Sequence, residues 1–392
     1  MKKIIVLGAM QMHVPLINYA KERGYYVITV DYTLDAPGHK VADEYSLIST
    51  TDLDAVTCLA RDKNVDIVMT FNSDPAAYTA AYVSNLLGLK GNQPQAVEIM
   101  SDKGLFRKFL SENGFNTPKY KVINSLNEIS NIDIDFPVIV KPVDSSGSKG
   151  ITKVEHRDLL GDAFKIASAF SRCKKVIIEE FIEPKYNQLH GDAFVNKGIV
   201  TDIFLGDHHF NYNINGLVPY STTFPTCIPK KELEKIENEV EKFIHLVGFS
   251  FGGINIEARI NKRNNKVYLI EIGARNGGNF TYEVIKNYSG FDFLKAIFDI
   301  YDDKISEQVK KIHEYSCYLI IHSDKNGVLK KVNIYREIEE LILDRKKYIK
   351  IGDDVHIFNG ANSAIEVLLL KSEKHSFFDL VENYNNYINV EC

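Results

Sequence analysis

The feature that most constrains this chain is an apolar strand that runs into a lysine and then into a loop of small residues. Residues 138–140 are β-branched, Lys141 and Pro142 end the run, and residues 144–150 read Asp-Ser-Ser-Gly-Ser-Lys-Gly. Small residues let backbone N–H groups surround phosphate oxygens, and a fixed lysine supplies a positive charge. The spacing differs from the P-loop pattern G-x-x-x-x-G-K-[ST]. Since residues 151–160 begin as a strand, we expect the loop to join two strands as a flap; an ordinary hairpin turn is the alternative.

Two acidic strands form the second constraint. By period-two alternation Glu257 shares a face with Arg259, and in the next strand Glu271 shares a face with Arg275. The polar residues 261–266 between the strands predict a hairpin that places Glu257 beside Glu271. Facing carboxylates repel unless a cation lies between them, and Mg²⁺ is commonly held by one or two carboxylates plus nucleotide phosphates. Structural ion pairs between these glutamates and the two arginines are the alternative.

Taken together, these segments resemble the ATP-grasp superfamily, especially its branch of carbamoyl phosphate synthase, biotin carboxylase and the late purine-synthesis enzymes. The resemblance covers most of the chain and rests on six pieces in the family's order: Lys103, Lys141, the flap 145–150, the hinge 176–183, Glu257 and the string 271–278. It implies a mixed α/β and α+β architecture in three parts. These are a Rossmann-like pre-ATP-grasp domain (1–95), a two-lobed ATP-grasp domain (96–304, flexible lobe about 117–183) and a small, mostly β C-terminal domain (305–392).

The resemblance implies ATP as a bound nucleotide, with Mg²⁺ or Mn²⁺ on Glu257 and Glu271. Two lysines would reach the phosphates, the flap would cover them, and hinge peptide groups would meet the adenine edge. The residues implied for the nucleotide are Lys103, Lys141, Ser145, Ser146, Gly147, Ser148, Glu179, Glu180, Phe181, Ile182 and Glu183. The alternative for each lysine is an ordinary solvent-exposed charge, and the alternative for Phe181 and Ile182 is packing in the core.

The chain departs from the family's pattern in two places. Many relatives carry an asparagine two residues after the second glutamate, where this chain has Gly273. A water, Asn255 or Asn276 must then complete the magnesium shell, or a single metal binds tightly. The family's ribose contact does not align clearly, and its candidates are Glu183, Gln188 and Asp192.

The N-terminal residues predict a parallel sheet, because residues 3–32 and 66–88 each read as strand and helix in βαβ order. The G-x-G-x-x-G fingerprint is missing, which argues against an NAD site. Open parallel sheets bind ligands beyond the carboxyl ends of their strands, here at residues 8–12, Asp31 and 72–74. For residues 72–74, capping of the following helix is the favoured alternative. Across the whole chain the substrate candidates are Gln11, Asn72, Ser73, Asp74, His190, Asp192, His209, Arg275, Gly277 and Gly278.

Histidines mark two polar islands between the hinge and the acidic hairpin. His190 lies in one island, and His208 and His209 lie in the other. They are candidates to touch the triphosphate or the second substrate. A zinc site is disfavoured because no Cys/His spacing pattern supports it, and structural or surface roles are expected for at least one of the three.

Composition excludes several classes of function. A formal net charge of -5 with interspersed signs gives no basic footprint for nucleic acid. No apolar run is long enough for a membrane span and no signal peptide is evident, so we expect a cytoplasmic protein. The five cysteines are scattered and odd in number, which argues against a disulfide framework.

The expected activity is that of a carboxylate–amine ligase. A small-molecule carboxylate would attack the γ-phosphorus of ATP, and an amine would then displace phosphate from the acyl phosphate, with release of ADP and phosphate. Lys141 and Arg275 are the catalytic candidates, because each would stabilise developing negative charge. Three alternatives stay open: a bicarbonate-using carboxylase or carbamoyl-phosphate-type enzyme, a small-molecule kinase, and a non-catalytic nucleotide-binding regulator. A homodimer is possible by analogy with the family.

Overall fold

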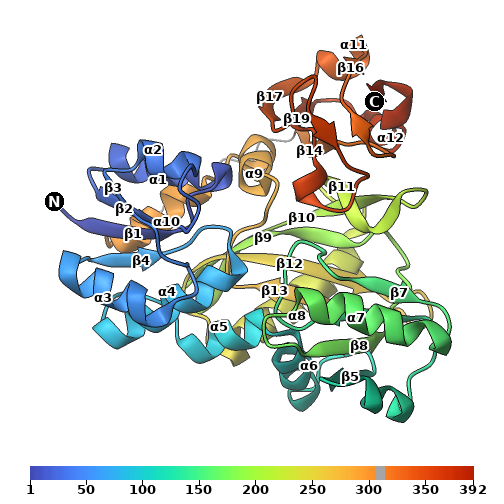
Figure 1. The fold of residues 1–392 in the computed structure, drawn as a ribbon, viewed down its shortest axis with the longest axis horizontal. Helices are drawn as coiled ribbons and strands as arrows, with labels where there is room; N and C mark the ends of the chain where they lie inside the picture. Colours follow the sequence, from blue (N-terminus) through green and yellow to red (C-terminus); the bar gives the residue numbers. More distant parts are fainter. Residues whose placement is uncertain (305–313) are drawn as a thin grey trace.

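The computed structural model describes residues 1–304 and 314–392, and its N-terminal part is a parallel sheet covered by helices (Figure 1). The strand order is β3-β2-β1-β4, so β2 and β3 lie on one side of β1 and β4 lies on the other. All strand pairs in this sheet are parallel, and the strands are apolar runs because both faces are covered. The elements are β1 (Lys3–Leu7), α1 (Val14–Glu22), β2 (Tyr26–Val30), α2 (Pro37–Val41), β3 (Glu44–Ser46), α3 (Leu53–Lys63), β4 (Ile67–Met69) and α4 (Asp74–Leu87).

Two helices lead from this part into a small antiparallel sheet of order β5-β8-β6-β7. Apolar residues on one face of the sheet pack against helix α7 and form a separate core. The predicted strand–loop–strand arrangement around the flap is confirmed, because β6 pairs antiparallel with β7. The elements are α5 (Pro94–Ser101), α6 (Lys103–Glu112), β5 (Tyr120–Ile123), β6 (Val138–Pro142), β7 (Thr152–Val154), α7 (Leu160–Phe170) and β8 (Val176–Glu180).

An antiparallel sheet of eight strands forms the centre of the molecule, in the order β13-β12-β9-β10-β11-β14-β19-β17. Helix α8 covers part of one face with the apolar side of its amphipathic sequence. The elements are β9 (Leu189–Asn196), β10 (Ile199–Asn211), β11 (Asn215–Phe224), α8 (Lys230–Val247), β12 (Gly252–Ile260), β13 (Val267–Gly273), α9 (Thr281–Ser289), α10 (Phe293–Tyr301), β14 (Tyr315–Ile321), β17 (Ile342–Lys347) and β19 (Glu366–Ser372).

The strands of the C-terminal part extend this central sheet. β14 pairs with β11, so the sheet continues past the boundary that the sequence places at residue 304. That boundary adjoins residues 305–313, which lie outside the described residues, and the division into three domains stays a prediction. The remaining elements are β15 (Gly327–Val328), β16 (Lys331–Ile334), α11 (Arg336–Glu339), β18 (Asp354–Val355), α12 (Phe377–Glu382) and β20 (Ile388–Glu391).

The predicted fold class is confirmed: a parallel α/β part precedes a large antiparallel sheet with helices. Helix α10 lies along the N-terminal part (Figure 1). Arg23 donates to Asp299 (3.1 Å), and Tyr25 donates to Asp302 (2.5 Å). These contacts join the turn between α1 and β2 to the end of α10. Among residues 1–304 and 314–392, no helix is long and apolar enough to cross a membrane.

Candidate active site

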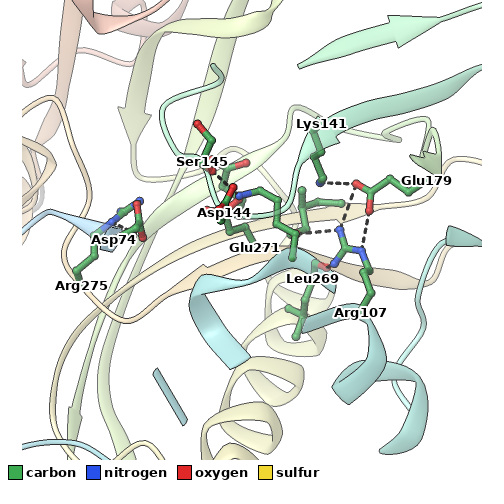
Figure 2. Close-up of polar contacts among 12 residues, drawn as sticks. Asp74, Arg107, Lys141, Asp144, Ser145, Glu179, Leu269, Glu271 and Arg275 are labelled. Atoms are coloured by element: carbon green, nitrogen blue, oxygen red, sulfur yellow. Dashed lines mark hydrogen bonds and ion pairs between the residues drawn. The ribbon is translucent and has the colours of Figure 1, made fainter. Parts of the chain in front are cut away.

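A cavity of about 310 Å³ lies between the small sheet, the central sheet and the loops of the N-terminal part. Most of the predicted site residues line it, although they come from segments far apart in the sequence. The predicted residues in its wall are Asn72, Asp74, Lys103, Lys141, Ser145, Ser146, Gly147, Ser148, Glu179, Glu180, Ile182, His190, Glu257, Glu271, Arg275 and Gly278. Figure 2 shows the polar contacts at its centre.

The acidic hairpin has the predicted register, with Glu257 directly opposite Glu271 on β12 and β13. Neither glutamate pairs with an arginine, so the alternative of structural Glu–Arg pairs is wrong. Glu271 instead accepts from Lys103 Nζ at 3.1 Å, and Glu257 accepts from Gln188 Nε2 at 2.8 Å. Burial and the nearby Glu271 carboxylate raise the pKa of Glu257 to about 7.

These two carboxylates fit a divalent cation that also binds phosphate. Glu257 and Glu271 face each other across the hairpin, and burial, together with the Glu271 charge, raises the pKa of Glu257. Among the described residues no cluster of three or more His, Cys, Asp or Glu side chains can hold a metal ion. Two carboxylates alone suit Mg²⁺ or Mn²⁺, because such ions complete their shell with water and nucleotide phosphates.

A buried charge cluster supports the lysine of β6. Glu179 contacts Lys141 Nζ on one side and accepts from Arg107 Nε at 2.9 Å on the other (Figure 2). Burial alone would favour the neutral acid, but Arg107 and Lys141 lower the pKa of Glu179 to about 2. Arg107 also donates to the carbonyls of Leu269 (3.0 Å) and Ile270 (2.9 Å) on β13. The cluster therefore fixes Lys141 against the acidic hairpin.

The hinge differs in part from the prediction. The N–H of Glu180 donates to Lys119 O at 2.8 Å, and the N–H of Phe181 donates to Pro137 O at 3.1 Å. These two peptide N–H groups are thus used within the small sheet. The N–H of Ile182 has no acceptor among the described residues, and Ile182 lines the cavity. Ile182 is the hinge residue whose N–H is free to meet an adenine edge.

The flap has the backbone that small residues permit. Gly147, Ser148 and Gly150 all have positive φ, and Ser148 at +58° is the non-glycine among them. The carbonyl of Ser145 accepts from Lys103 Nζ at 2.8 Å, and Ser148 Oγ donates to Leu217 O at 3.2 Å. The flap therefore spans the cavity from helix α6 to strand β11.

Residues 72–74 lie at the start of α4, as the capping interpretation predicts, but the side-chain cap bond does not form. Ser73 occupies the N-cap position of α4 without a side-chain hydrogen bond, and Asp74 forms a bidentate ion pair with Arg275. Arg275 Nε donates to Asp74 Oδ1 at 2.9 Å and Nη2 donates to Oδ2 at 2.7 Å (Figure 2). The pair joins the N-terminal part to the end of β13, and both side chains line the cavity.

Several predicted residues lie outside the cavity wall. Asp192 is buried and accepts from Gly277 N at 2.9 Å, so both residues support the loop that follows β13. Glu183 pairs with Lys262 at 2.8 Å on the surface, which disfavours it as the ribose contact. The remaining residues absent from the wall are Gln11, Ser73, Phe181 and His209.

The histidines form a neutral network in place of a metal site. His190 and His208 stack with ring centroids 4.2 Å apart, and both share the hydroxyl of Thr222. Burial lowers the pKa of His190 to about 3 and lowers that of His208 well below its ordinary range. His209 points to Thr223 at 2.9 Å, away from the other two.

Comparison with known proteins gives one family match. Residues 134–283 match the family described as the ATP-grasp domain, and they include the flap, the hinge and both glutamates. The match to the ATP-grasp domain is therefore shown for this middle part of the chain. Two solved structures share the fold over the full length of this chain. They are phosphoribosylglycinamide synthetase from Anaerococcus prevotii (TM-score 0.77, 24% identity, covering 100% of this chain and 99% of that one) and L-amino acid ligase from Bacillus licheniformis (TM-score 0.85, 18% identity, 100% and 98%).

One curated relative is the formate-dependent phosphoribosylglycinamide formyltransferase of Herminiimonas arsenicoxydans. It is 31% identical over 190 residues, which are 47% of this chain and 47% of that protein. The chain spans about half the length of such curated relatives in these matches. Sequence similarity to these relatives therefore covers only part of the chain, while the fold of the Anaerococcus prevotii structure matches its full length.

Gly273 departs from the ATP-grasp pattern for a steric reason. A Cβ atom at Gly273 would lie 3.0 Å from Asp74 Oδ1, so a side chain there would crowd the Asp74–Arg275 pair. Asn255 is the register partner of Gly273 across the hairpin and lines the cavity. Its Nδ2 donates to Gly191 O (3.0 Å), while Oδ1 has no donor among the described residues. Asn276 is absent from the cavity wall.

Sequence reasoning missed Arg107 and Tyr318. Arg107 lies one helical turn after Lys103, a spacing that could have indicated a second charge on the same face of α6. Tyr318 lines the cavity from β14 and accepts from Thr222 Oγ1 at 2.8 Å. No motif points to Tyr318, because it reaches the site only through the pairing of β14 with β11.

We expect Glu257→Gln to stabilise the metal-free protein at about pH 8. The pKa of Glu257 in the folded state lies above its ordinary value, so the folded state binds more protons and the free energy of unfolding falls as pH rises from about 4.5 to about 7. Glu257→Gln removes the titrating carboxyl, so the variant should not lose this part of the free energy of unfolding, about 1 to 3 kcal/mol. Urea unfolding in EDTA at about pH 5 and pH 8 measures it. An equal effect of the substitution at both pH values would contradict the assignment.

We expect Asp74→Ala to destabilise the protein by roughly 2 to 4 kcal/mol, because it leaves the Arg275 guanidinium buried without its partner. The adjacent substitution Ser73→Ala should change stability by less than about 0.5 kcal/mol, since Ser73 makes no cap bond. Urea unfolding of both variants compares neighbouring positions at the start of α4. A larger loss in Ser73→Ala would restore the capping interpretation.

Proposed function

We propose that this protein is an ATP-dependent ligase that activates a small-molecule carboxylate as an acyl phosphate and joins it to an amine. The observation that carries the proposal is one cavity in which Lys103 and Lys141 face the Glu257–Glu271 pair under a small-residue flap. Its relative from Herminiimonas arsenicoxydans and its structural neighbours are named as a formyltransferase, a synthetase and a ligase. The reaction releases ADP and phosphate.

The two lysines neutralise the phosphates of ATP. Lys103 reaches the cavity from α6 and Lys141 reaches it from β6. Without nucleotide, Lys103 pairs with Glu271 and Lys141 contacts Glu179. On ATP binding, Lys103 exchanges Glu271 for phosphate, which frees that carboxylate. The flap then excludes water, which would hydrolyse an acyl phosphate.

Glu257 and Glu271 would hold Mg²⁺ or Mn²⁺. Asn255 Oδ1 would be a third ligand, in place of the asparagine that many relatives carry at the position of Gly273. The ion, when bound, offsets the negative charge of the transferring phosphoryl group. Gln188 orients Glu257 through its amide, and Arg259 Nε in turn donates to Gln188 Oε1 at 2.7 Å. These contacts orient the Glu257 carboxylate, and its negative charge is not paired directly with the Arg259 guanidinium.

Arg275 is the candidate that holds the substrate carboxylate and then the oxyanion formed when the amine attacks. Its pairing with Asp74 leaves it oriented before substrate arrives. The fork of the guanidinium can bind a second carboxylate while it keeps one contact to Asp74. Asp74 in this arrangement orients Arg275.

The test is ADP release from Mg²⁺-ATP across a matrix of carboxylates and amines. Formate is included because a relative is named as formate-dependent, and bicarbonate is included for the carboxylase alternative. ADP that requires both a carboxylate and an amine supports the ligase. ADP with one acceptor alone points to a kinase or a bicarbonate-using enzyme, and nucleotide binding without ADP points to a regulator. The cytoplasmic location and a homodimer stay predictions.

A further inference from the structure

Tyr318 of β14 brings a phenol hydroxyl into the cavity wall, where the proposed reaction gives it no role. Its side chain is 1% exposed. A series of neighbouring side chains joins it to the acidic hairpin. Glu257 lies opposite His190, and the His190 ring stacks on that of His208 at 4.2 Å. His208 lies opposite Thr222, which in turn lies opposite Tyr318. The phenol therefore belongs to the same cavity wall as the proposed metal ligands.

The hydrogen bonds of Thr222 decide which way the phenol can donate. Thr222 Oγ1 donates to the Tyr318 hydroxyl at 2.8 Å. The same oxygen lies 2.7 Å from His208 Nδ1 and 3.2 Å from His190 Nδ1. A hydroxyl has one hydrogen and two lone pairs, so both imidazoles donate to Thr222. Asn255 Nδ2, 2.9 Å from His190 Nε2, agrees with this tautomer because an amide nitrogen only donates. The hydrogen of the phenol must therefore point elsewhere.

That hydrogen has no acceptor in the part of the chain that the structure describes, residues 1–304 and 314–392. Burial raises the pKa of Tyr318, and the Glu257 carboxylate raises it further, while hydrogen bonds from Thr222 and Asn279 lower it. The net effect is a rise, so the phenol keeps its proton at neutral pH. A buried donor without an acceptor costs free energy, and a ligand that accepts from it removes this cost.

The surroundings of this hydroxyl favour a carboxylate as the acceptor. Asn279, which donates to it, lines the cavity on the loop that also carries Arg275. The charge of Glu257 acts on the same hydroxyl. Anionic oxygens are the strongest acceptors for an O–H group. The phosphates of ATP have two lysines and the bound ion, whereas Arg275 alone is assigned to the substrate carboxylate.

We propose that Tyr318 is a further catalytic residue, whose phenol donates a hydrogen bond to the carboxylate that is activated and then to the oxyanion formed when the amine attacks. This inference rests on the proposed ligase function for the identity of the steps. The proton stays on Tyr318 throughout, so no bond to hydrogen forms or breaks. The contact strengthens as negative charge builds on the acyl oxygen. Thr222 is a positioning residue, because it holds the phenol oxygen and leaves the hydrogen for the substrate.

Tyr318→Phe tests the contact, because it removes the oxygen and keeps the ring. The kcat for carboxylate-dependent ADP release should fall about a hundredfold, while the KM for ATP stays within about twofold. The matched control is Tyr220→Phe, the same change at a buried tyrosine of β11 whose hydroxyl donates to Val381 O at 3.3 Å and which is absent from the cavity wall. An unchanged kcat in Tyr318→Phe, or an equal loss in Tyr220→Phe, overturns the inference.

Two variants test the positioning role of Thr222. Thr222→Val removes the hydroxyl and should lower kcat about tenfold, since the phenol is no longer held from Thr222. Thr222→Ser keeps the hydroxyl and should recover most of that loss. Equal losses of kcat in the two variants would overturn the positioning role.

A spectroscopic readout separates this inference from the proposed function. In the full chain labelled with ¹³C at the phenol carbon Cζ of tyrosine, the Tyr318 signal is the one missing from Tyr318→Phe. With Mg²⁺ and a non-hydrolysable ATP analogue bound, at least one carboxylate of the ADP assay should shift this signal saturably. Such a shift without ADP release from any carboxylate–amine pair keeps the contact and overturns the ligase.

The opposite result keeps the ligase and overturns the inference: ADP release that needs a carboxylate and an amine, with a Tyr318 signal that no carboxylate moves. A signal that moves with the ATP analogue alone assigns the phenol to phosphate and overturns the inference as well. The absence of a shift with every carboxylate overturns it whatever the ADP assay shows.

Discussion

Glu271→Gln is expected to lower ADP release by roughly a thousandfold or more while the fold stays intact. The substitution keeps the shape of the side chain but removes the charge that faces Glu257 across the hairpin and receives Lys103 at 3.1 Å. An amide oxygen can contact Mg²⁺ but carries no negative charge, so it holds the ion more weakly than the carboxylate, and charge on the transferring phosphoryl group is then less well compensated. The assay is ADP release under the conditions at which the unmodified protein turns over.

The control for this variant is Glu373→Gln, which makes the same change at an exposed glutamate outside the cavity wall. Circular dichroism should give the same spectrum for both variants and for the unmodified protein. Full activity in Glu271→Gln would remove the acidic hairpin from the reaction. A loss of the same size in Glu373→Gln would show that the assay does not report on the cavity.

Glu179→Leu is expected to have the largest effect on stability, a loss of roughly 3 to 5 kcal/mol. The substitution leaves Arg107 and Lys141 buried without their shared counter-ion, and both are less than a tenth exposed. Removing one member of a buried charge cluster costs more than the cluster contributes, because the remaining charges lose their partner away from water. Urea unfolding followed by circular dichroism measures the loss.

A double substitution separates the charge effect from the loss of packing. Glu179→Leu combined with Arg107→Met removes one negative and one positive charge, so it should recover part of the stability that Glu179→Leu loses. ATP affinity should fall in both variants, because Lys141 is no longer fixed against β13. Additive losses in the double variant would mean that Glu179 and Arg107 act independently.

Low pH should act on the same cluster. The pKa of Glu179 in the folded state lies below its ordinary value because of Arg107 and Lys141. Its contribution to stability is therefore present above about pH 4.5 and is lost as the pH falls toward about 2. In Glu179→Leu this part of the acid-induced loss should be missing.

Local patterns determined much of the site. The hairpin that sets Glu257 opposite Glu271 follows from period-two alternation on either side of a polar turn, and the register agrees with it. The flap follows from small residues between two short strands, where only glycine-like flexibility permits the backbone seen at Gly147 and Gly150. Both features depend on neighbours in the chain, and such features are the ones that a sequence can specify alone.

What only the tertiary structure decided concerns pairs of residues from distant segments. Asp74 looked like part of a helix cap, yet it binds Arg275, which lies 201 positions further along the chain. Arg107 meets Glu179 through the packing of α6, and Tyr318 reaches the cavity through the pairing of β11 with β14. The sequence by itself determined the flap and the acidic hairpin through contiguous motifs, whereas long-range packing decided how these motifs meet the N-terminal part and β14, because those contacts join segments far apart in the chain.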